Sequence, residues 1–435
     1  MSVTAALVTA GVAVTSGLMW QWRRVGAGSV PTPQDHAGAA PPELRTAVLV
    51  VTDPAQLAVM WPALGLGSWQ VGYPNVLAAE YTPFGMSVEV QILGGQKLKD
   101  WNNEDTLDVL AQYLGVPTVT ATSTGPGFVR LDLRVYDTLA DAVAPRLPAD
   151  GVDLEAVPVG LTEDGEVWRV PVQGRHVLMG GRTGSGKSGV LQALIYALAP
   201  AIASGRVDLR VLDPKGGMEL GFLEPMCTRF HCTMPEEMIG MLEETVTDMQ
   251  EAANRYRGKT RKPVPTRDNP LTVIIIDEAA TLSAFTDSKL RDRFERAHGM
   301  LLSQGRAPLF SVIETVIDPS KDTVPQRQLF PYRIGLGMDE PTQVAMIHGQ
   351  GARERGSRCD EISTTTPGVC YVQEDGKASV TRVRAYHVTD DDIDWMVATY
   401  APRHDIVDVT PDPDFDPATF DPDDLGDGDT GEVAA

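Results

Sequence analysis

Apolar and polar positions follow two different patterns along this chain, and the change falls near residue 155. Beyond it, short and wholly apolar runs alternate with longer stretches that repeat apolar residues at helical spacing. This order predicts an α/β domain in which a parallel sheet is covered by helices on both faces. The predicted strands are Val177 to Met179, Leu209 to Leu212, Leu271 to Ile276, Leu309 to Ile313, Tyr332 to Leu336 and Gly368 to Val372; the predicted helices are Gly189 to Ala199, Pro235 to Tyr256 and Asp287 to Leu302.

The earlier part of the chain predicts a separate, small α/β domain over residues 45–145. Apolar and polar residues alternate from Met86 to Leu93, as in a half-buried strand, and Glu104 to Leu114 has helical spacing. We also expect strands at Arg45 to Val51, Thr118 to Thr122 and Phe128 to Val135. Because this domain contains no cluster of His, Cys or paired carboxylates, we expect it to serve assembly or spacing.

The N-terminal residues have the composition of a membrane anchor followed by a linker. Val3 to Trp20 is uncharged and has about the minimum length for a bilayer-spanning helix. Trp22 and an arginine pair follow, which suits a cytoplasmic membrane boundary. We therefore expect a single-pass anchor at 1–24 with the body of the protein in the cytoplasm. A soluble leader, or a helix packed on protein, is the alternative. Residues 25–44 are rich in Gly, Ala and Pro and predict a flexible linker.

The formal net charge of −22 is unevenly distributed. Residues 401–435 hold eleven acidic residues, one arginine and several Asp-Pro pairs, which predicts an acidic, disordered tail. The tail carries −10 of the charge and leaves −12 on the rest. Net charge governs solubility and the long-range steering of ligands, but it does not decide what a local patch of side chains can bind. The acidity therefore weakens a nucleic-acid-binding hypothesis without excluding it.

A glycine-rich segment between a predicted strand and a predicted helix matches the P-loop pattern at every fixed position. Such glycines let the backbone wrap around phosphates with its N–H groups pointing inward. We expect ATP to be bound here, with the lysine reaching the β and γ phosphates and the serine hydroxyl binding Mg²⁺. The segment consists of Gly181, Arg182, Thr183, Gly184, Ser185, Gly186, Lys187 and Ser188.

A second motif supports hydrolysis as well as binding. The apolar run Thr272 to Ile276 is followed directly by Asp277 and Glu278. A buried strand that delivers two carboxylates at its end is the second half of a P-loop site. We expect Asp277 to hold the Mg²⁺ shell and Glu278 to be the catalytic general base that deprotonates the attacking water. A strand followed by an acidic helix cap is the structural alternative.

Four further motifs follow the P-loop along the chain. They are Asp213-Pro214-Lys215-Gly216-Gly217, Gln304-Gly305-Arg306-Ala307, Phe330-Pro331-Tyr332-Arg333-Ile334 and His348-Gly349-Gln350-Gly351-Ala352-Arg353. With these motifs in this order, the chain from Val157 to Tyr400 resembles the FtsK/SpoIIIE group of DNA-translocating ATPases. The small preceding domain and the lone anchor are most similar to the short conjugative-transfer (Tra-type) proteins of actinobacterial plasmids and integrative elements.

The resemblance implies a ring, expected to be a homo-hexamer, with ATP between neighbouring subunits and double-stranded DNA through the pore. It also implies that an arginine of one subunit reaches its neighbour's γ-phosphate. Arg333 and Arg306 are the catalytic candidates, and each could equally be a structural arginine paired with a carboxylate.

One position departs from the family pattern. Relatives usually carry a sensor glutamine just before an Asp-Pro pair, whereas Ile317 precedes Asp318 here. Thr315 and Glu314 are candidates to replace it. Because an apolar side chain cannot polarise water, the departure puts the coupling of ATP hydrolysis in doubt, but not ATP binding.

Between Arg255 and Arg267 lie six basic residues and no acids, together with a glycine and two prolines, which predicts a basic loop. Such a loop binds phosphates without choosing a sequence. A solvated loop that balances an acidic body is the alternative. No recognition helix or aromatic stacking platform is evident.

The sequence therefore favours a membrane-anchored, ATP-driven translocase of double-stranded DNA that acts in transfer between cells or compartments. Two alternatives stay open. An ATPase of the same fold could move protein, as in type VII secretion, although those proteins usually carry several ATPase modules in tandem. The chain could also be an ATP-gated scaffold that does not translocate, which the departure at Ile317 keeps open.

Overall fold

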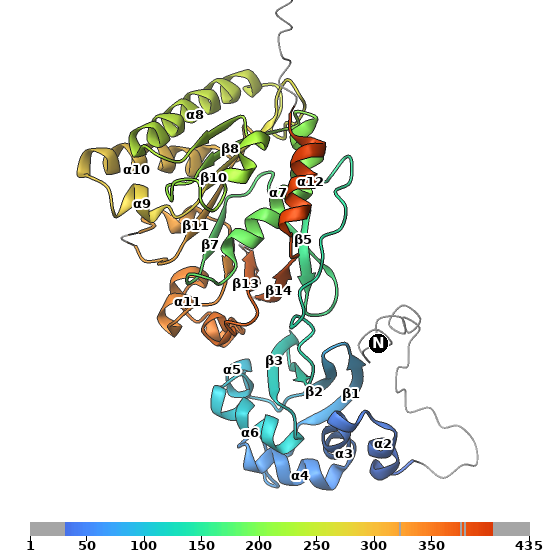
Figure 1. Cartoon of the computed structure of the whole chain (residues 1–435). Helices are drawn as coiled ribbons and strands as arrows, with labels where there is room; N and C mark the ends of the chain where they lie inside the picture. The colour runs from blue at the N-terminus through green and yellow to red at the C-terminus, as the bar shows by residue number, and fades with distance from the viewer. Residues whose placement is uncertain (1–30, 322, 375, 378–379, 403–435) are drawn as a thin grey trace, which may run out of the picture.

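A computed structural model describes residues 31–402 except 322, 375, 378 and 379. They form a small domain and a large domain joined by an extended segment (Figure 1). The predicted anchor and the predicted acidic tail lie outside the described residues, apart from the first two residues of the tail. None of the described helices is both long and apolar enough to cross a bilayer.

The large domain is built on a ten-stranded mixed sheet with the order β6-β5-β14-β13-β12-β7-β11-β10-β8-β9. The six strands from β12 to β9 are parallel, as predicted, whereas the four at the other side pair antiparallel. Short hairpins join β5 to β6 and β13 to β14, and a hairpin can connect only antiparallel strands. The strands are β5 (Val157–Thr162), β6 (Val167–Val170), β7 (Val177–Gly180), β8 (Val207–Leu212), β9 (Arg229–His231), β10 (Leu271–Ile276), β11 (Phe310–Val316), β12 (Tyr332–Gly335), β13 (Val369–Glu374) and β14 (Thr381–Ala385).

Helices cover both faces of this sheet, as the pattern predicted. On β10, Val273 and Ile275 join a core with α7 and α12, whereas Ile274 and Ile276 join a core with α8 and α10. A parallel strand buried on both faces needs a continuous apolar run, which is why these strands were recognisable. The helices are α7 (Lys187–Ala203), α8 (Pro235–Tyr256), α9 (Ala280–Ser283), α10 (Ser288–Gln304), α11 (Pro341–His348) and α12 (Asp390–Tyr400), with 3-10 turns η2 (Gly221–Met226), η3 (Arg327–Leu329), η4 (Arg353–Arg355) and η5 (Cys359–Glu361).

The small domain is a four-stranded antiparallel sheet, ordered β1-β2-β4-β3, with helices packed on one face. Its core includes an edge-to-face pair of Trp61 and Trp101, whose ring centroids are 5.4 Å apart. Strand β1 was not predicted. The elements are α2 (Pro33–Ala39), η1 (Pro42–Leu44), α3 (Arg45–Thr52), α4 (Pro54–Ala63), β1 (Asn75–Thr82), β2 (Gly85–Gln91), α5 (Leu98–Trp101), α6 (Glu104–Leu114), β3 (Thr118–Gly125) and β4 (Phe128–Arg134).

The prediction of a strand at Arg45 to Val51 was wrong, because this segment is helix α3. Its Ala47, Val48, Val50 and Val51 side chains are all buried in the core of the small domain. β-branched residues weaken a helix by only fractions of a kcal/mol each, roughly, and burying them gains more. Tertiary packing therefore overrides the local preference.

The prediction of a flexible linker over 25–44 was wrong for its second half, since Pro33–Ala39 forms helix α2. Thr32 caps this helix: its Oγ1 accepts a hydrogen bond from the Asp35 N–H at 3.2 Å, and the Asp35 carboxylate accepts one from the Thr32 N–H at 2.8 Å. This reciprocal capping box was present in the sequence, but the Gly, Ala and Pro content masked it.

Ion pairs join the two domains through the turn between β5 and β6 and through β14. Arg134 of β4 makes a two-pronged contact with Glu163, at 2.5 and 3.0 Å. Arg382 of β14 does the same with Asp137, at 2.8 and 3.1 Å. Planar guanidinium–carboxylate pairs of this kind fix orientation as well as distance.

We predict that Gly160→Ala lowers the thermal unfolding midpoint of the protein. A Cβ at this position of β5 would lie 2.0 Å from the Arg384 carbonyl oxygen on β14, so the strand pairing would have to shift at a cost of about 1–3 kcal/mol. The matched control is Gly240→Ala in helix α8, where nothing lies within 4 Å of the new Cβ. That change should raise stability by about 1 kcal/mol. Equal midpoints for the two variants would contradict the prediction.

Candidate nucleotide site

Four neighbouring parallel strands end at one edge of the large sheet, and the predicted site residues follow them. The order β7-β11-β10-β8 places the loop after β7 beside the ends of the other three strands. Crevices at the carboxyl ends of parallel strands are the usual ligand sites of such sheets. The structure therefore brings the predicted P-loop and the predicted carboxylates together at this edge (Figure 1).

The P-loop backbone requires its glycines. Gly184 and Gly186 have φ angles of 77° and 99°, which side chains rarely adopt. A Cβ on Gly186 would also lie 2.3 Å from the Gly368 nitrogen, and one on Gly181 would lie 2.7 Å from the Ser185 hydroxyl oxygen. Thr183 and Gly184 form the exposed tip of the loop. The loop is thus a tightly folded backbone turn open to solvent at its tip.

Helix α7 starts inside the loop and points its amino end at the centre of the site. Its first hydrogen bond within the turn runs from the Val190 N–H to the Gly186 carbonyl, so the N–H groups before it have no intrahelical acceptor. Unpaired N–H groups and the helix dipole together favour an anion. Because α7 is seventeen residues long, the dipole is fully developed. This geometry fits a phosphate group.

The Lys187 side chain folds over the loop that would hold the phosphates. Its Nζ donates to the carbonyl oxygens of Gly181, at 2.7 Å, and Arg182, at 3.3 Å. Burial lowers the pKa of Lys187, and the nearby Glu278 carboxylate offsets part of that effect. A negatively charged group bound nearby would therefore stabilise the Lys187 ammonium.

Arg182 has a structural role that the motif alone did not indicate. Its guanidinium donates to the carbonyl oxygens of Met338, at 2.7 Å, and Ile362, at 2.9 Å. It also lies 3.6 Å from the Asp339 carboxylate. Arg182 therefore ties the P-loop to the segments that follow β12 and precede β13.

Asp277 is fixed from two sides at the end of β10. Its Oδ1 accepts a hydrogen bond from the Thr315 hydroxyl at 2.7 Å, and its Oδ2 lies 3.0 Å from the Lys215 Nζ. Burial pulls the pKa of Lys215 down, but Asp277 and Glu219 raise it above the usual lysine value overall. The ammonium of Lys215 is therefore stabilised beside the Asp277 carboxylate.

Glu278 adopts a strained backbone that aims its carboxyl group into the site. Its φ is 57°, a left-handed conformation that costs a non-glycine residue roughly 1–3 kcal/mol. Its N–H donates to the Thr315 Oγ1 at 3.0 Å, and its Oε1 accepts from the Ile317 N–H at 3.4 Å. Its Oε2 is buried and has no hydrogen-bond partner among the described residues. Burial raises the pKa of Glu278, although Ile317, Lys187 and Lys215 oppose the shift.

The structure separates the two candidates for the sensor position. Thr315 lies in the site, because its single hydroxyl donates to Asp277 and accepts from the Glu278 backbone. Glu314, the adjacent residue on β11, is buried elsewhere, with its Oε2 2.7 Å from the His298 Nε2. Ile317 contributes its backbone N–H rather than its side chain. A polar hydroxyl therefore contacts the Asp277 carboxylate and the Glu278 backbone despite the departure at Ile317.

Sequence reasoning missed two site residues, Lys215 and Glu219. Glu219 accepts a hydrogen bond from the Ser188 hydroxyl at 2.6 Å. Because that hydroxyl donates its proton to Glu219, its lone pairs remain available to a cation. Lys215 belongs to the Asp-Pro-Lys-Gly-Gly motif after β8, whose place at the carboxyl end of a parallel strand was a usable signal.

The two candidate arginines donate hydrogen bonds to carbonyl oxygens of their own chain. The Arg333 guanidinium donates to the carbonyl oxygens of Phe330, at 3.0 Å, and Ile347, at 3.3 Å. Arg306 precedes β11 and so lies at the opposite edge of the sheet, where its exposed side chain donates to the Gly174 carbonyl at 2.9 Å. Arg306 therefore cannot act on a phosphate bound to its own P-loop without a large movement.

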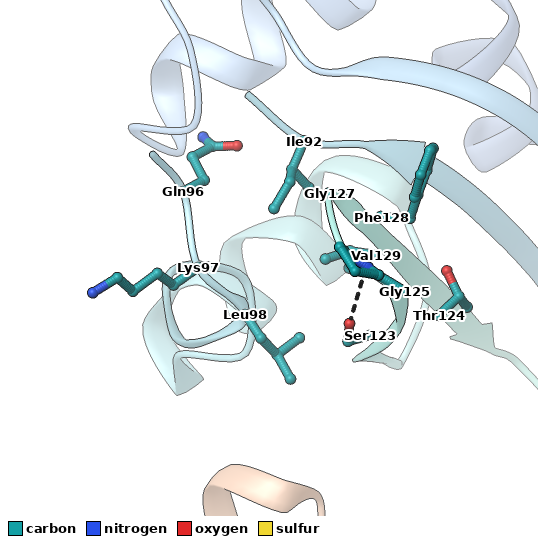
Figure 2. A pocket seen from close by; sticks show the side chains of 11 residues that line it. Ile92, Gln96, Lys97, Leu98, Ser123, Thr124, Gly125, Gly127, Phe128 and Val129 are labelled. Atoms are coloured by element: carbon teal, nitrogen blue, oxygen red, sulfur yellow. Dashed lines mark hydrogen bonds between the residues drawn. The ribbon is translucent and has the colours of Figure 1, made fainter. Parts of the chain in front are cut away.

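A hollow of about 510 Å³ lies in the small domain, around the turn between β3 and β4 (Figure 2). Lys97 is its one charged lining residue, and no carboxylate or histidine lines it. Figure 2 shows the Lys97 ammonium pointing away from the other lining side chains. The chemistry of a catalytic centre is therefore found at the P-loop and not in this hollow.

Comparison with known proteins agrees with this site. Residues 156–265 match the model of the FtsK/SpoIIIE family. The DNA translocase FtsK of Lactiplantibacillus plantarum is 24% identical over 280 residues, which are 58% of this chain and 32% of that protein. FtsK of Staphylococcus aureus strain Mu50 is 25% identical over 262 residues, 55% of this chain and 32% of that protein. The chain thus spans about a third of the length of these relatives.

The fold is also similar to a solved structure. The monomer form of the pCW3 conjugation coupling protein TcpA, determined with ATPγS, aligns with a TM-score of 0.50 at 17% identity. The alignment covers 79% of this chain and 98% of that chain, so it includes more than the matched family segment. The match to the family model over residues 156–265 confirms the resemblance inferred from the motifs, and the structural match shows the fold alone.

We predict that Thr315→Val slows ATP turnover about 10- to 100-fold while nucleotide binding is retained, because one hydroxyl orients both Asp277 and the Glu278 backbone. Steady-state hydrolysis and equilibrium binding of a fluorescent ATP analogue would measure the two effects. Thr272→Val is the matched control, since its hydroxyl lies 3.4 Å from Asp208 at the other end of β10. A similar loss in both variants would show that the effect is structural.

We predict that ATP turnover falls in acid with a midpoint above pH 4.5, the usual pKa of a glutamic acid. A general base must be ionised, and burial raises the pKa of Glu278, so activity is lost as the pH falls through that raised pKa. In Lys215→Met the midpoint should move to still higher pH, because the Lys215 charge holds the pKa of Glu278 down. Rates across pH, with folding checked by circular dichroism, would measure both midpoints. A midpoint that is the same in the two proteins would contradict this assignment.

Proposed function

We propose that this chain, which carries a P-loop ATPase domain of the FtsK/SpoIIIE family, is an ATP-driven motor that moves double-stranded DNA. One observation carries the proposal: the P-loop, which lies in the segment that matches the family model, meets Asp277, Glu278 and Thr315 at one edge of the sheet. The named relatives are DNA translocases, and the similar fold is that of a conjugation coupling protein. DNA transfer between cells or compartments is the process that fits both.

In this proposal the P-loop binds the triphosphate of ATP. The amino end of α7 faces the phosphates, and Lys187 exchanges its carbonyl contacts for phosphate oxygens. Ser188 and Asp277 would hold Mg²⁺, which would neutralise negative charge on the phosphates during phosphoryl transfer. Their oxygens fit a hard cation, and Glu219 keeps the Ser188 hydroxyl oriented.

Glu278 provides the general base for hydrolysis. Its unpartnered Oε2 accepts a proton from a water molecule as the water oxygen bonds to the γ-phosphorus. The bond from the γ-phosphorus to the bridging oxygen breaks, and that oxygen leaves with ADP. A raised pKa makes Glu278 a stronger base, while Lys215 and Lys187 keep it ionised near neutral pH.

DNA would contact the basic loop between α8 and β10. Its basic side chains are exposed, while Pro263 and Pro265 are buried beneath it, so the loop is held to the domain. Gln173 reinforces this attachment by donating to the Pro263 carbonyl. The loop precedes β10 and so lies at the opposite edge of the sheet from the P-loop. Phosphates would be bound there without sequence choice.

A ring of identical subunits, expected to be a hexamer, would place an arginine of one subunit against its neighbour's ATP. Arg306 becomes the better candidate, because its guanidinium is exposed and donates to a single carbonyl oxygen. Arg333 is held by several carbonyl oxygens of its own chain. A head-to-tail contact brings opposite sides of two copies together, so a residue far from its own site can reach the next one.

Membrane attachment through residues 1–24, with the ATPase domain in the cytoplasm, remains part of the proposal. It rests on the uncharged run from Val3 to Trp20 and the arginine pair that follows it. The second candidate function is the transport of protein instead of DNA. The net charge of −22 favours it, because negative charge opposes binding to nucleic acid.

We predict that duplex DNA stimulates ATP hydrolysis severalfold or more and that Lys187→Ala abolishes turnover. Replacing Arg257, Lys259, Arg261 and Lys262 by Gln should weaken DNA binding at every sequence tested. The slope of log K against log salt should become shallower by about 0.9 for each phosphate that the variant no longer binds. Displacement of a triplex-forming strand from duplex DNA would then report movement as distinct from binding.

The matched control replaces Lys97 and Lys99 by Gln, because these lysines lie on the small domain, away from the basic loop. It should leave both the DNA affinity and the salt slope unchanged. If duplex DNA neither binds nor changes the rate of hydrolysis, the motor proposal fails, and a protein cargo or an ATP-gated scaffold takes its place.

A further inference from the structure

Helix α4 (Pro54–Ala63) has no polar face. Its inner side buries Met60 and Trp61 in the core of the small domain. Its outer side exposes Ala55, Val59 and Ala63, and Val59 is 62% exposed. These outer residues recur at i, i+4 and i+8, so they lie on one face of the helix. A surface helix of a soluble domain normally carries charged or polar residues there.

The segment after α4 extends this uncharged surface. Trp69 is 82% exposed and Val71 is 69% exposed, at a turn closed by a bridge between Ser68 and Gly72. The edge strand β1 adds the partly exposed Leu77. No charged residue occurs in the 26 residues from 54 to 79. Single exposed apolar side chains are ordinary, but a continuous uncharged segment that exposes several of them marks an interaction surface.

We propose that this segment, residues 54–79, lies in the interfacial layer of a lipid bilayer. The inference rests on the proposed membrane anchor and adds a second contact between the protein and the membrane. Trp side chains favour the membrane–water interface, because the indole combines an apolar body with a polar N–H. A helix that is apolar on its outer face can bury that face at the boundary between headgroups and acyl chains.

The position of the segment supports a bilayer as the occupant. In Figure 1, α4 lies at the end of the small domain that faces away from the large domain, so contact there leaves the P-loop domain unobstructed. Helix α2 begins at Pro33, nine residues beyond the predicted anchor. Nine extended residues span at most about 30 Å, which keeps the small domain at the membrane surface.

The absence of charged residues from the segment limits how it can bind a membrane. Without lysine or arginine, the segment gains nothing from anionic headgroups, so contact should depend on apolar burial alone. Its burial should therefore be the same in neutral and in anionic vesicles, and insensitive to salt. A protein partner held by ion pairs would find no charged residue within the segment to pair with.

The test places a fluorescent label beside Trp69 in the full chain. Gln70→Cys, in a Cys232→Ser background, puts the label at an exposed position without removing Trp69 or Val71. The chain is reconstituted into phosphatidylcholine vesicles, with and without phosphatidylserine, and separated by flotation. Quenching by doxyl-labelled lipid and by aqueous iodide then reports the surroundings of the label. Leu147→Cys, 76% exposed on the segment between the domains, is the matched control.

We expect lipid-borne quencher to reach the label at 70 and iodide quenching there to fall severalfold on vesicles. The label at 147 should stay open to iodide. Combining Trp69→Ser with Val71→Ser should restore iodide access at 70 while the chain still floats with the vesicles. Neither exchange touches the P-loop, so DNA-stimulated ATP hydrolysis reports the motor proposal separately.

Three results would overturn the inference. If the chain floats but iodide reaches position 70 as freely as position 147, the anchor stands and the segment does not contact lipid. If the label is already shielded without vesicles, a second copy of the chain covers the segment instead. If the chain does not float at all, both the anchor and the lipid contact are wrong, whatever the ATPase assay shows.

Discussion

The parallel pairing of β10 with β11 is the constraint on which the candidate site depends. It sets the end of β11 beside the end of β10, so that the Thr315 hydroxyl lies 2.7 Å from the Asp277 carboxylate and accepts the Glu278 N–H. The same sheet places β7 next to β11, and the P-loop is thereby delivered to the same edge. A slip of one residue would turn Thr315 to the opposite face, because side chains alternate along a strand.

Charge balance allows these groups to be buried together. Asp277 and Glu278 are nearly inaccessible to water, and burying a charged group is costly unless an opposite charge or a hydrogen bond accompanies it. Lys187 and Lys215 supply the two positive charges that oppose this effect. The strained backbone of Glu278 is a further cost, and the contacts from Thr315 and Ile317 hold it in place. Such strain is characteristic of functional sites, where the surrounding structure fixes a conformation that the isolated chain would avoid.

The architecture separates three surfaces. The P-loop occupies one edge of the large sheet, the basic loop and Arg306 occupy the opposite edge, and the uncharged segment lies on the small domain (Figure 1). Bidentate ion pairs such as Arg134 with Glu163 hold the two domains in register. A motor that uses ATP at one place, contacts DNA at another and rests on a membrane at a third would need such a separation.

Much of the large domain could be predicted from the sequence, because its signals are local. The buried strands read as continuous apolar runs, and the P-loop and the two carboxylates follow their strands directly. The small domain was less predictable. In α3 the β-branched residues suggested a strand, and only packing made the segment a helix. A local sequence pattern does not reveal when tertiary packing overrides the preference of a segment for strand or helix. The stabilising contacts come from residues that are distant in the sequence.

What the sequence determined by itself was the chemistry available: a phosphate loop, a lysine, a serine and two adjacent carboxylates. The tertiary structure decided how these groups are arranged and which others join them. Lys215 and Glu219 come from the segment after β8, and Thr315 comes from β11. Thr315 rather than Glu314 faces the site because of the register of β11. A side chain's face and its partners depend on strand pairing across long stretches of sequence, and no local pattern records that pairing.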